Sequence, residues 1–429
     1  MVGVCAFLVG LPQVAWASSV EASPLASTGT ACSPSRGPAE APSTPLPTDD
    51  PFYRYPGGLA GRAPGTVLKS RPIALGILAN GPGVDATQVL YRTTAELGQP
   101  AATVAAIIEG PGRLRGIVSY QDPYDGLGPQ CDPSYNLRAG VTPVDRVVTP
   151  AVIAKYVAAG FAVVVPDYEE EQFANDAGQE EGYATLDAIR AAEHRLGAPE
   201  ASTPVGLVGF SGGATATDYA TELAPRYAPG LDIVGAAEDG VAVDYVHNID
   251  YVNGSADWSE VVPAALVGLS RAFRIDLGKY LSPVGKEIIA QVSGACLGSI
   301  ALPPTTLDEL FLPRYRDIFA VPVFRQMFNR LIMSRTGTPR GPLLLANRDS
   351  DGTGDGVTIA KDVEGLAHVY CQRGVSVQFH EYEGLDHGQS FAPFSAEALA
   401  FLVRRLHRLP VANGCRSIGA GNALTPLRP

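Results

Sequence analysis

One serine lies in a segment whose spacing is typical of nucleophilic catalysis. Gly209-Phe210-Ser211-Gly212-Gly213 fits the pattern G-x-S-x-G, in which a tight turn between a strand and a helix exposes a serine hydroxyl. Residues 205–208 predict the strand and residues 213–227 the helix. Such a turn leaves room only for small neighbours, which the glycines supply. We interpret Ser211 as a nucleophile, with a simple glycine-rich turn as the alternative.

The residue after Ser211 is a candidate for binding negative charge. A helix that starts here presents N–H groups without intrahelical partners and the positive end of its dipole. The N–H of Gly212 would therefore face the oxyanion of a tetrahedral intermediate. Together the two residues predict attack by a serine on a carbonyl carbon.

A serine hydroxyl needs a general base, and one of the six histidines stands in the expected place. His387 lies in the segment Gly384–Gly388, after a predicted strand and before the last predicted helix. The chain order serine, acid, histidine is the one found with G-x-S-x-G turns. We therefore take His387 as the candidate base, and a surface histidine without a catalytic role is the alternative.

The acid that orients the histidine is expected in the loop 347–356, after the predicted strand 342–346. Asp355 directly precedes the next helix and is the first candidate, and Asp351 is the second. A calcium loop is an alternative, because Asp349, Asp351 and Asp355 alternate with Gly, Ser and Thr. The full D-x-[DN]-x-[DN]-G spacing and its bidentate Glu are absent, however. The carboxylates outside the triad are then expected to be solvated turn residues.

Alternating strands and helices are expected to position these residues. The predicted strands are 86–94, 103–108, 114–120, 161–166, 205–208, 232–237, 342–346 and 375–382. The predicted helices between them are 149–159, 181–196, 213–227, 358–373 and 395–409. This alternation predicts an α/β fold with a mostly parallel central sheet and helices on both faces. Residues 240–338 hold amphipathic stretches such as 261–273 and 307–333, which we interpret as an inserted helical cap, with a separate helical domain as the alternative.

Composition divides the rest of the chain. Residues 1–17 are predicted to be a signal peptide that lacks its basic N-terminal part, with Ala15-Trp16-Ala17 as the cleavage pattern. A buried helix is the alternative, and the apolar run is too short for a membrane anchor. Residues 18–48 are rich in Pro, Ser and Ala and predict a disordered leader. The remaining segments are expected to be the sheet domain at 49–239 and 339–415, and a tail at 416–429.

Charge and cysteine content restrict the function. A net charge of −12 argues against nucleic-acid binding, which needs an excess of Lys and Arg. No apolar run after the N-terminus is long enough to predict a transmembrane segment. There is no C-x-x-C pair, so a zinc or thioredoxin-like site is not expected. Export would allow disulfides and remove Cys5, and Cys32 is then the candidate for a free thiol.

Further motifs along the chain resemble one family. Four parts of the chain are similar to the secretory lipases of the fungal lipase A type. They are Ser119–Asp125, Cys131–Tyr135, the G-F-S-G-G turn followed by Tyr227-Ala228-Pro229, and Asp355-Gly356-Val357. Many members of that family are actinobacterial. The resemblance covers about 49–415. It implies the α/β-hydrolase fold, with a cap inserted after the strand that follows the helix of the serine turn.

The resemblance also implies the roles of individual residues. Ser211, Asp355 and His387 match the family's catalytic triad, and the N–H groups of Gly212 and Asp125 match its oxyanion hole. Two disulfides are implied: Cys131–Cys296 would join the oxyanion loop to the cap, and Cys371–Cys415 would join the helix after the acid loop to the C-terminal tail.

Two features depart from the family's pattern. The acid loop is longer and richer in Asp and Gly than in the fungal members. Glu169-Glu170-Glu171 stands where a Gly-containing loop is expected, and it predicts either an altered pocket rim or a solvated surface.

Residues and resemblance together predict a secreted serine lipase that hydrolyses fatty-acid esters of the triacylglycerol type through an acyl-enzyme, without metal or organic cofactor. Apolar side chains in 261–273 and 307–333 predict an acyl tunnel or transient contact with a lipid interface, or else packing on the core. One alternative is a carboxylesterase or acyltransferase on shorter or cell-envelope esters. Another is a non-catalytic binding protein on a hydrolase scaffold.

Overall fold

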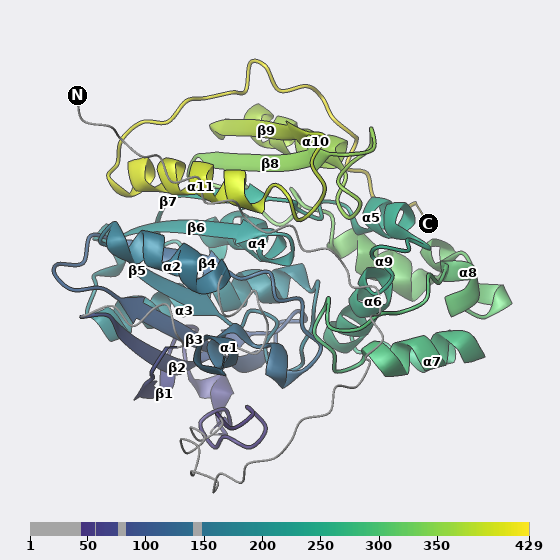
Figure 1. Ribbon diagram of the computed structural model, residues 1–429, viewed down its shortest axis with the longest axis horizontal. Helices are drawn as coiled ribbons and strands as arrows, with labels where there is room; N and C mark the ends of the chain where they lie inside the picture. The colour runs from purple at the N-terminus through teal and green to yellow at the C-terminus, as the bar shows by residue number, and fades with distance from the viewer. Residues whose placement is uncertain (1–43, 56, 76–82, 140–147, 429) are drawn as a thin grey trace, which may run out of the picture. The chain divides into compact units, whose positions relative to one another are not determined.

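A nine-stranded sheet forms the centre of the computed structural model, which describes residues 44–55, 57–75, 83–139 and 148–428 (Figure 1). The predicted signal peptide, most of the predicted leader, Cys5 and Cys32 lie outside the described residues. The strands are β1 Val67–Pro72, β2 Asp85–Thr94, β3 Pro100–Glu109, β4 Ile117–Gln121, β5 Ala162–Pro166, β6 Pro204–Phe210, β7 Asp232–Asp239, β8 Leu343–Asp349 and β9 Val377–Glu383.

The sheet is mostly parallel. Its strand order is β1-β2-β3-β5-β4-β6-β7-β8-β9. The run from β5 to β9 in this order is parallel, whereas β1, β2 and β3 pair antiparallel at one edge. Every residue of β4 and β5 is buried, as expected for parallel strands covered on both faces. The ends of β6, β7 and β8 therefore lie side by side, which is where polar side chains from separate strands can meet.

Helices cover both faces of the sheet. One face carries α3 Gly178–Leu196, α4 Gly212–Tyr227 and α10 Ala360–Gln372. The other face carries α1 Pro133–Ala139, α2 Thr149–Ala158 and α11 Phe391–Leu406. Each set of helices shares a buried apolar cluster with the strands below it. The predicted fold class, an α/β hydrolase with a mostly parallel sheet and helices on both faces, is confirmed.

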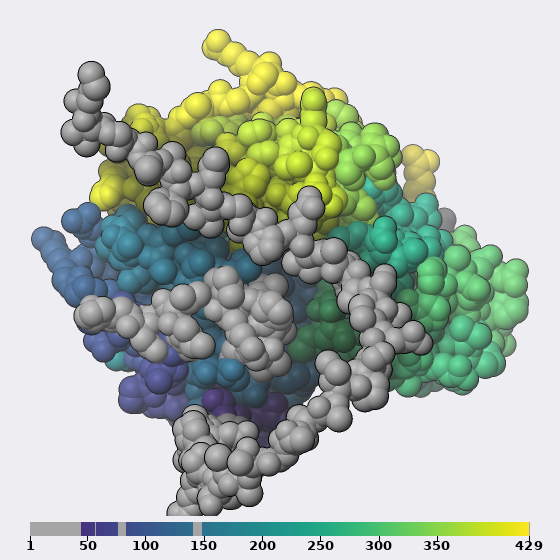
Figure 2. All heavy atoms as spheres, viewed as in Figure 1, coloured from purple at the N-terminus to yellow at the C-terminus, as the bar shows by residue number. Residues whose placement is uncertain are grey.

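The helical insertion lies between β7 and β8 and has its own apolar core. Its helices are α5 Tyr245–Val252, α6 Val261–Ala272, α7 Pro283–Val292, α8 Leu307–Leu310 and α9 Pro322–Arg330. They form a lobe beside the sheet, drawn in green in Figures 1 and 2. We call this lobe the cap. The boundaries predicted for it, 240 and 338, stay predictions.

Some elements differ from those expected. The stretch 307–333 is broken into α8, two short 3₁₀ turns and α9, because Pro313 and Pro322 each begin a new helical segment. The edge strand β1 was not predicted, since its side chains are only partly buried and leave a weak apolar pattern. Among the described helices, none is long and apolar enough to cross a membrane.

Candidate active site

Ser211 lies on a sharp turn between β6 and α4. Its φ of 57° is in the left-handed region, which non-glycine residues occupy only under strain. The turn is crowded: a Cβ on Gly209 would lie 2.0 Å from the Gly213 carbonyl oxygen, and one on Gly213 would lie 2.1 Å from the Gln121 carbonyl oxygen. Glycine is therefore required at both positions, and the backbone holds the Ser211 hydroxyl clear of the sheet.

The three residues predicted as a catalytic triad lie together. Ser211 Oγ is 2.8 Å from His387 Nε2, and His387 Nδ1 is 2.8 Å from Asp355 Oδ2. His387 lies between β9 and α11, where its ring and the Asp355 carboxylate are both buried. This hydrogen-bonded chain is the arrangement that lets an imidazole accept a serine proton while a carboxylate orients the ring.

The Asp355 carboxylate is held in its charged form. Burial alone would raise its pKa, but the neighbouring His387 and Arg348 and hydrogen bonds from the loop keep that pKa well below the usual range. The backbone N–H groups of Val357 and Thr358 donate to Oδ1 at 2.9 and 2.6 Å. Asp351, the second candidate, lies exposed; it accepts hydrogen bonds from the Tyr251 hydroxyl and from its own loop. The geometry therefore favours Asp355 as the acid.

Gly212 and Asp125 face each other across the mouth of the turn. A Cβ on Gly212 would lie 1.8 Å from Asp125 Oδ1, so any larger residue here would have to displace the Asp125 carboxylate. Gly212 begins α4, and its N–H has no partner within the helix. Asp125 has a φ of 39°, and Oδ1 has no hydrogen-bond partner in the described part of the chain. Burial, and then the charges of Asp176 and Asp122, raise the pKa of Asp125 to about 7.

The loop that carries Asp125 is anchored from two sides. Glu169 is buried, and its carboxylate accepts the Gly126 N–H at 3.1 and 3.0 Å. On the cap side, Leu297 N–H donates to the Asp125 carbonyl at 3.2 Å, and the predicted disulfide Cys131–Cys296 is present with Cα atoms 5.4 Å apart. The loop position is thus set by the core and the cap together.

Of the two alternatives for the glutamate run, a solvated surface is wrong for Glu169 and Glu170, which are buried, whereas Glu171 is exposed. Glu169 lies against the oxyanion loop, and an altered pocket rim stays a prediction. Burial raises the pKa of both Glu169 and Glu170 well above the usual range. The predicted Cys371–Cys415 disulfide is also present and joins α10 to the C-terminal tail.

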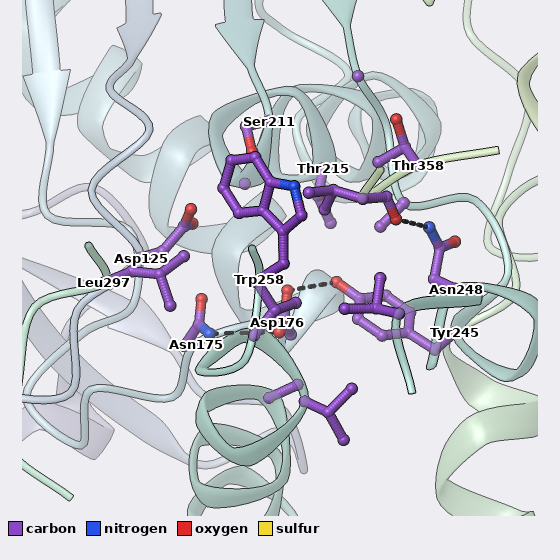
Figure 3. A pocket seen from close by; sticks show the side chains of 18 of the residues that line it. Asp125, Asn175, Asp176, Ser211, Thr215, Tyr245, Asn248, Trp258, Leu297 and Thr358 are labelled. Atoms are coloured by element: carbon purple, nitrogen blue, oxygen red, sulfur yellow. Dashed lines mark hydrogen bonds between the residues drawn. The ribbon is translucent and has the colours of Figure 1, made fainter. Parts of the chain in front are cut away.

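A pocket opens beside Ser211 and runs under the cap. It encloses about 660 Å³ of space that is partly open to solvent. In Figure 3 the Trp258 indole stands in front of Ser211, with Asp125 to one side and Tyr245 and Asn248 to the other. The Trp258 ring also meets the His387 ring edge-on, with centroids 5.2 Å apart. The apolar lining comes mostly from α5 and α6 and includes Ala242, Ile249, Val252, Val261, Val262 and Ala265.

Three residues of the site were not found from the sequence. Arg348, at the end of β8, and Asp239, at the end of β7, form a buried ion pair behind His387. Trp258 belongs to the turn before α6. The sequence offered no signal for Arg348, because it stands between Asn347 and Asp349 in a polar segment that was expected to belong to the acid loop. For Trp258 there was none either, because a lone tryptophan between helices predicts core packing equally well.

The sheet, the cap and the strand–turn–helix serine define the chain as an α/β hydrolase. The protein belongs to the secretory lipase family, whose sequence profile matches residues 138–414. It is 33% identical to "Probable inactive lipase MT1628" of Mycobacterium tuberculosis, over 86% of this chain and 84% of that one. It is 30% identical to Lipase A of Arthroderma benhamiae, with 86% and 84% covered. Candida antarctica lipase A in its closed state superposes with a TM-score of 0.78 at 27% identity, covering 88% and 90%.

These findings confirm the predicted family. Membership implies a lipid or ester substrate and a hydrolase of the lipase or esterase class.

Proposed function

We propose that the protein is a secreted serine lipase that hydrolyses fatty-acid esters of the triacylglycerol type. The observation that supports this most directly is the hydrogen-bonded chain from Ser211 through His387 to Asp355, which opens onto the pocket. Similarity to Lipase A of Arthroderma benhamiae and to Candida antarctica lipase A supports the substrate class. Membership of the secretory lipase family supports an extracellular location.

In the proposed reaction His387 takes the Ser211 proton as the hydroxyl oxygen attacks the ester carbonyl carbon. The N–H groups of Gly212 and Asp125 donate to the oxyanion, and each such donor is worth about 3–4 kcal/mol in the transition state. Asp355 orients the ring and stabilises the imidazolium. His387 then protonates the leaving alcohol, and water hydrolyses the acyl-enzyme by the same steps.

The cap surrounds Ser211 with an apolar pocket lining and an indole ring. The apolar residues of α5 and α6 suit an alkyl chain, and burying each CH₂ group there would contribute about 0.8 kcal/mol. The Trp258 indole of the cap stands in front of Ser211 in Figure 3, and its ring contacts the His387 ring edge-on. We propose that the acyl chain lies under the cap and that the cap meets the lipid interface.

A shorter or more polar ester is the second candidate, and the pocket itself carries the argument for it. Asp125, Asn175 and Asp176 line the pocket, and Asp176 accepts a hydrogen bond from the Tyr245 hydroxyl at 2.7 Å. A long alkyl chain gains nothing from these polar groups, whereas a hydroxylated or short acyl group would. A carboxylesterase or acyltransferase therefore stays open.

The test is hydrolysis of p-nitrophenyl esters from acetyl to palmitoyl by the protein with its disulfides formed, with Ser211→Ala beside it. Rates that rise with chain length and fall at least about 10⁴-fold in the variant support the lipase. Activity confined to short chains supports the esterase. One relative is called inactive by name. A folded protein that hydrolyses no ester in this series would contradict the proposed function.

A further inference from the structure

The residues behind His387 form a second layer that the proposed triad mechanism does not require. Arg348 and Asp239 are fully buried. The guanidinium donates to Asp239 Oδ2 at 2.7 Å and also bonds Asp355 Oδ2, the same oxygen that accepts the His387 Nδ1–H. Ser390 completes the layer: its hydroxyl donates to Asp239 Oδ2 at 2.7 Å and contacts Arg348.

The layer connects elements that are far apart in the sequence. Arg348 is the last residue but one of β8, Asp239 ends β7, and Ser390 immediately precedes α11. The planar guanidinium of Arg348 reaches Asp239, Asp355 and Ser390 because it presents five N–H donors in a fixed fork. The Arg348 carbon Cζ also lies 4.7 Å from the centroid of the Phe210 ring, next to Ser211 in the chain. Arg348 is therefore immobilised at the point where the acid meets the histidine.

A buried cation so close to the imidazole has an electrostatic consequence. Arg348 Nη1 is 3.0 Å from His387 Nδ1. The positively charged guanidinium repels a positive charge on His387. It also shares the Asp355 carboxylate, which would otherwise interact with the imidazolium alone. Asp239 acts in the opposite direction. Burial raises the pKa of Asp239, and the nearby Arg348, Ser390 and His387 partly offset that rise.

The other groups around His387 do not replace this cation. The cap contributes Trp258, which is uncharged. From β9, the Tyr382 hydroxyl donates to Glu397 at 2.7 Å, and burial raises the pKa of Tyr382 far above the working range. Asp386, the preceding residue, is exposed and accepts backbone N–H groups of its own turn. Among these neighbours Arg348 is the cation.

Resting on the proposed function, we infer that Arg348 is a positioning residue that holds the Asp355 carboxylate against His387 Nδ1. Asp239 balances the Arg348 charge and fixes the guanidinium. Loss of the pair is then expected to lower kcat, because the acid is aimed less well at the histidine, while KM changes little.

The test compares kcat and KM for a soluble p-nitrophenyl ester in the parent protein and in Arg348→Met/Asp239→Asn, which removes both charges together. In the double variant kcat is expected to fall by about tenfold or more while KM stays nearly unchanged. Arg348→Lys keeps the cation but makes fewer bonds, so it should recover only part of kcat.

Titration with a phosphonate ester counts the active sites, so that kcat is expressed per folded site. A merely structural role would lower the number of sites and the melting temperature without lowering kcat per site, and that result would overturn the inference. If the double variant does not fold, Arg348→Lys decides alone, and an unchanged kcat per site in that variant would overturn the inference. Failure of the proposed function shows separately, as absence of ester hydrolysis in the parent protein.

Discussion

Replacing Asp125 by Asn is expected to extend ester hydrolysis to higher pH. Asp125 Oδ1 is buried, has no hydrogen-bond partner among the described residues, and faces Gly212, whose N–H is proposed to bind the oxyanion. Burial raises the pKa of this carboxyl to about 7. Below that pH the group is neutral, and above it the group is an anion beside a developing anion. Asparagine keeps the shape and stays neutral throughout.

Coulomb's law gives the size of the effect. Two like charges about 5 Å apart repel by about 3 kcal/mol at an effective dielectric constant near 20, and we take this as the repulsion between the ionised Asp125 carboxylate and the oxyanion. That corresponds to a loss of about 10²-fold in kcat/KM as Asp125 ionises. The neighbouring Asp176, with a pKa of about 6, is charged over most of this range in both proteins.

The assay is kcat/KM for a soluble p-nitrophenyl ester from pH 5 to 9.5 in the parent protein and in Asp125→Asn. The parent is expected to lose activity with a midpoint near pH 7, and the variant to remain level to higher pH. Thermal unfolding at each pH serves as the control, because the raised pKa also makes the fold less stable as pH rises from about 4 to about 7. Identical alkaline limbs in two folded proteins would refute the reasoning.

Three further results are expected. Cys131→Ser/Cys296→Ser removes a disulfide that spans 165 residues, so the free energy of unfolding in urea should fall by about 5 kcal/mol. The double variant should also lower kcat more than it raises KM, and an unchanged kcat would argue against anchoring of the oxyanion loop. Gly209→Ala places a Cβ 2.0 Å from a backbone oxygen, so it should destabilise the fold by about 3 kcal/mol or more and abolish hydrolysis; a stable, active variant would contradict the crowding. Burial raises the pKa of Glu180 to about 8 and of Asp167 to about 7, so the melting temperature by calorimetry should fall from pH 4.5 to 8.5, and a flat profile would show that these carboxyls ionise freely.

Local sequence patterns were sufficient to predict much of the candidate active site. The glycines around Ser211 predict a tight turn because their spacing reflects backbone crowding, and the structure shows that crowding directly. His387 and Asp355 were expected in loops after two particular strands, and parallel strands bring such loops to one edge of the sheet. The strand and helix order was predictable for the same reason, since buried parallel strands are continuous apolar runs.

What could not be predicted depends on contacts between distant segments. Glu169 and Glu170 look like surface residues in a charged run, yet the fold buries both, and Glu169 accepts the N–H of Gly126, 43 positions away in the chain. The ion pair between Arg348 and Asp239 joins residues 109 positions apart, and no local pattern encodes it. A single sequence shows the type of a charged residue but not the partner that makes its burial tolerable.

The isolated bridge between Gly126 and Cys296 has a consequence for how the cap can vary. The segment around Leu297 supplies backbone contacts and the disulfide to the loop of Asp125, so this part of the cap belongs mechanically to the oxyanion hole. The cap is then not a freely exchangeable module. A chimera that takes its cap from another family member would have to keep residues 295–297 in register, while α7 to α9 could be replaced. Variation of the cap is thus expected mainly in α7 to α9, which do not line the pocket beside Ser211.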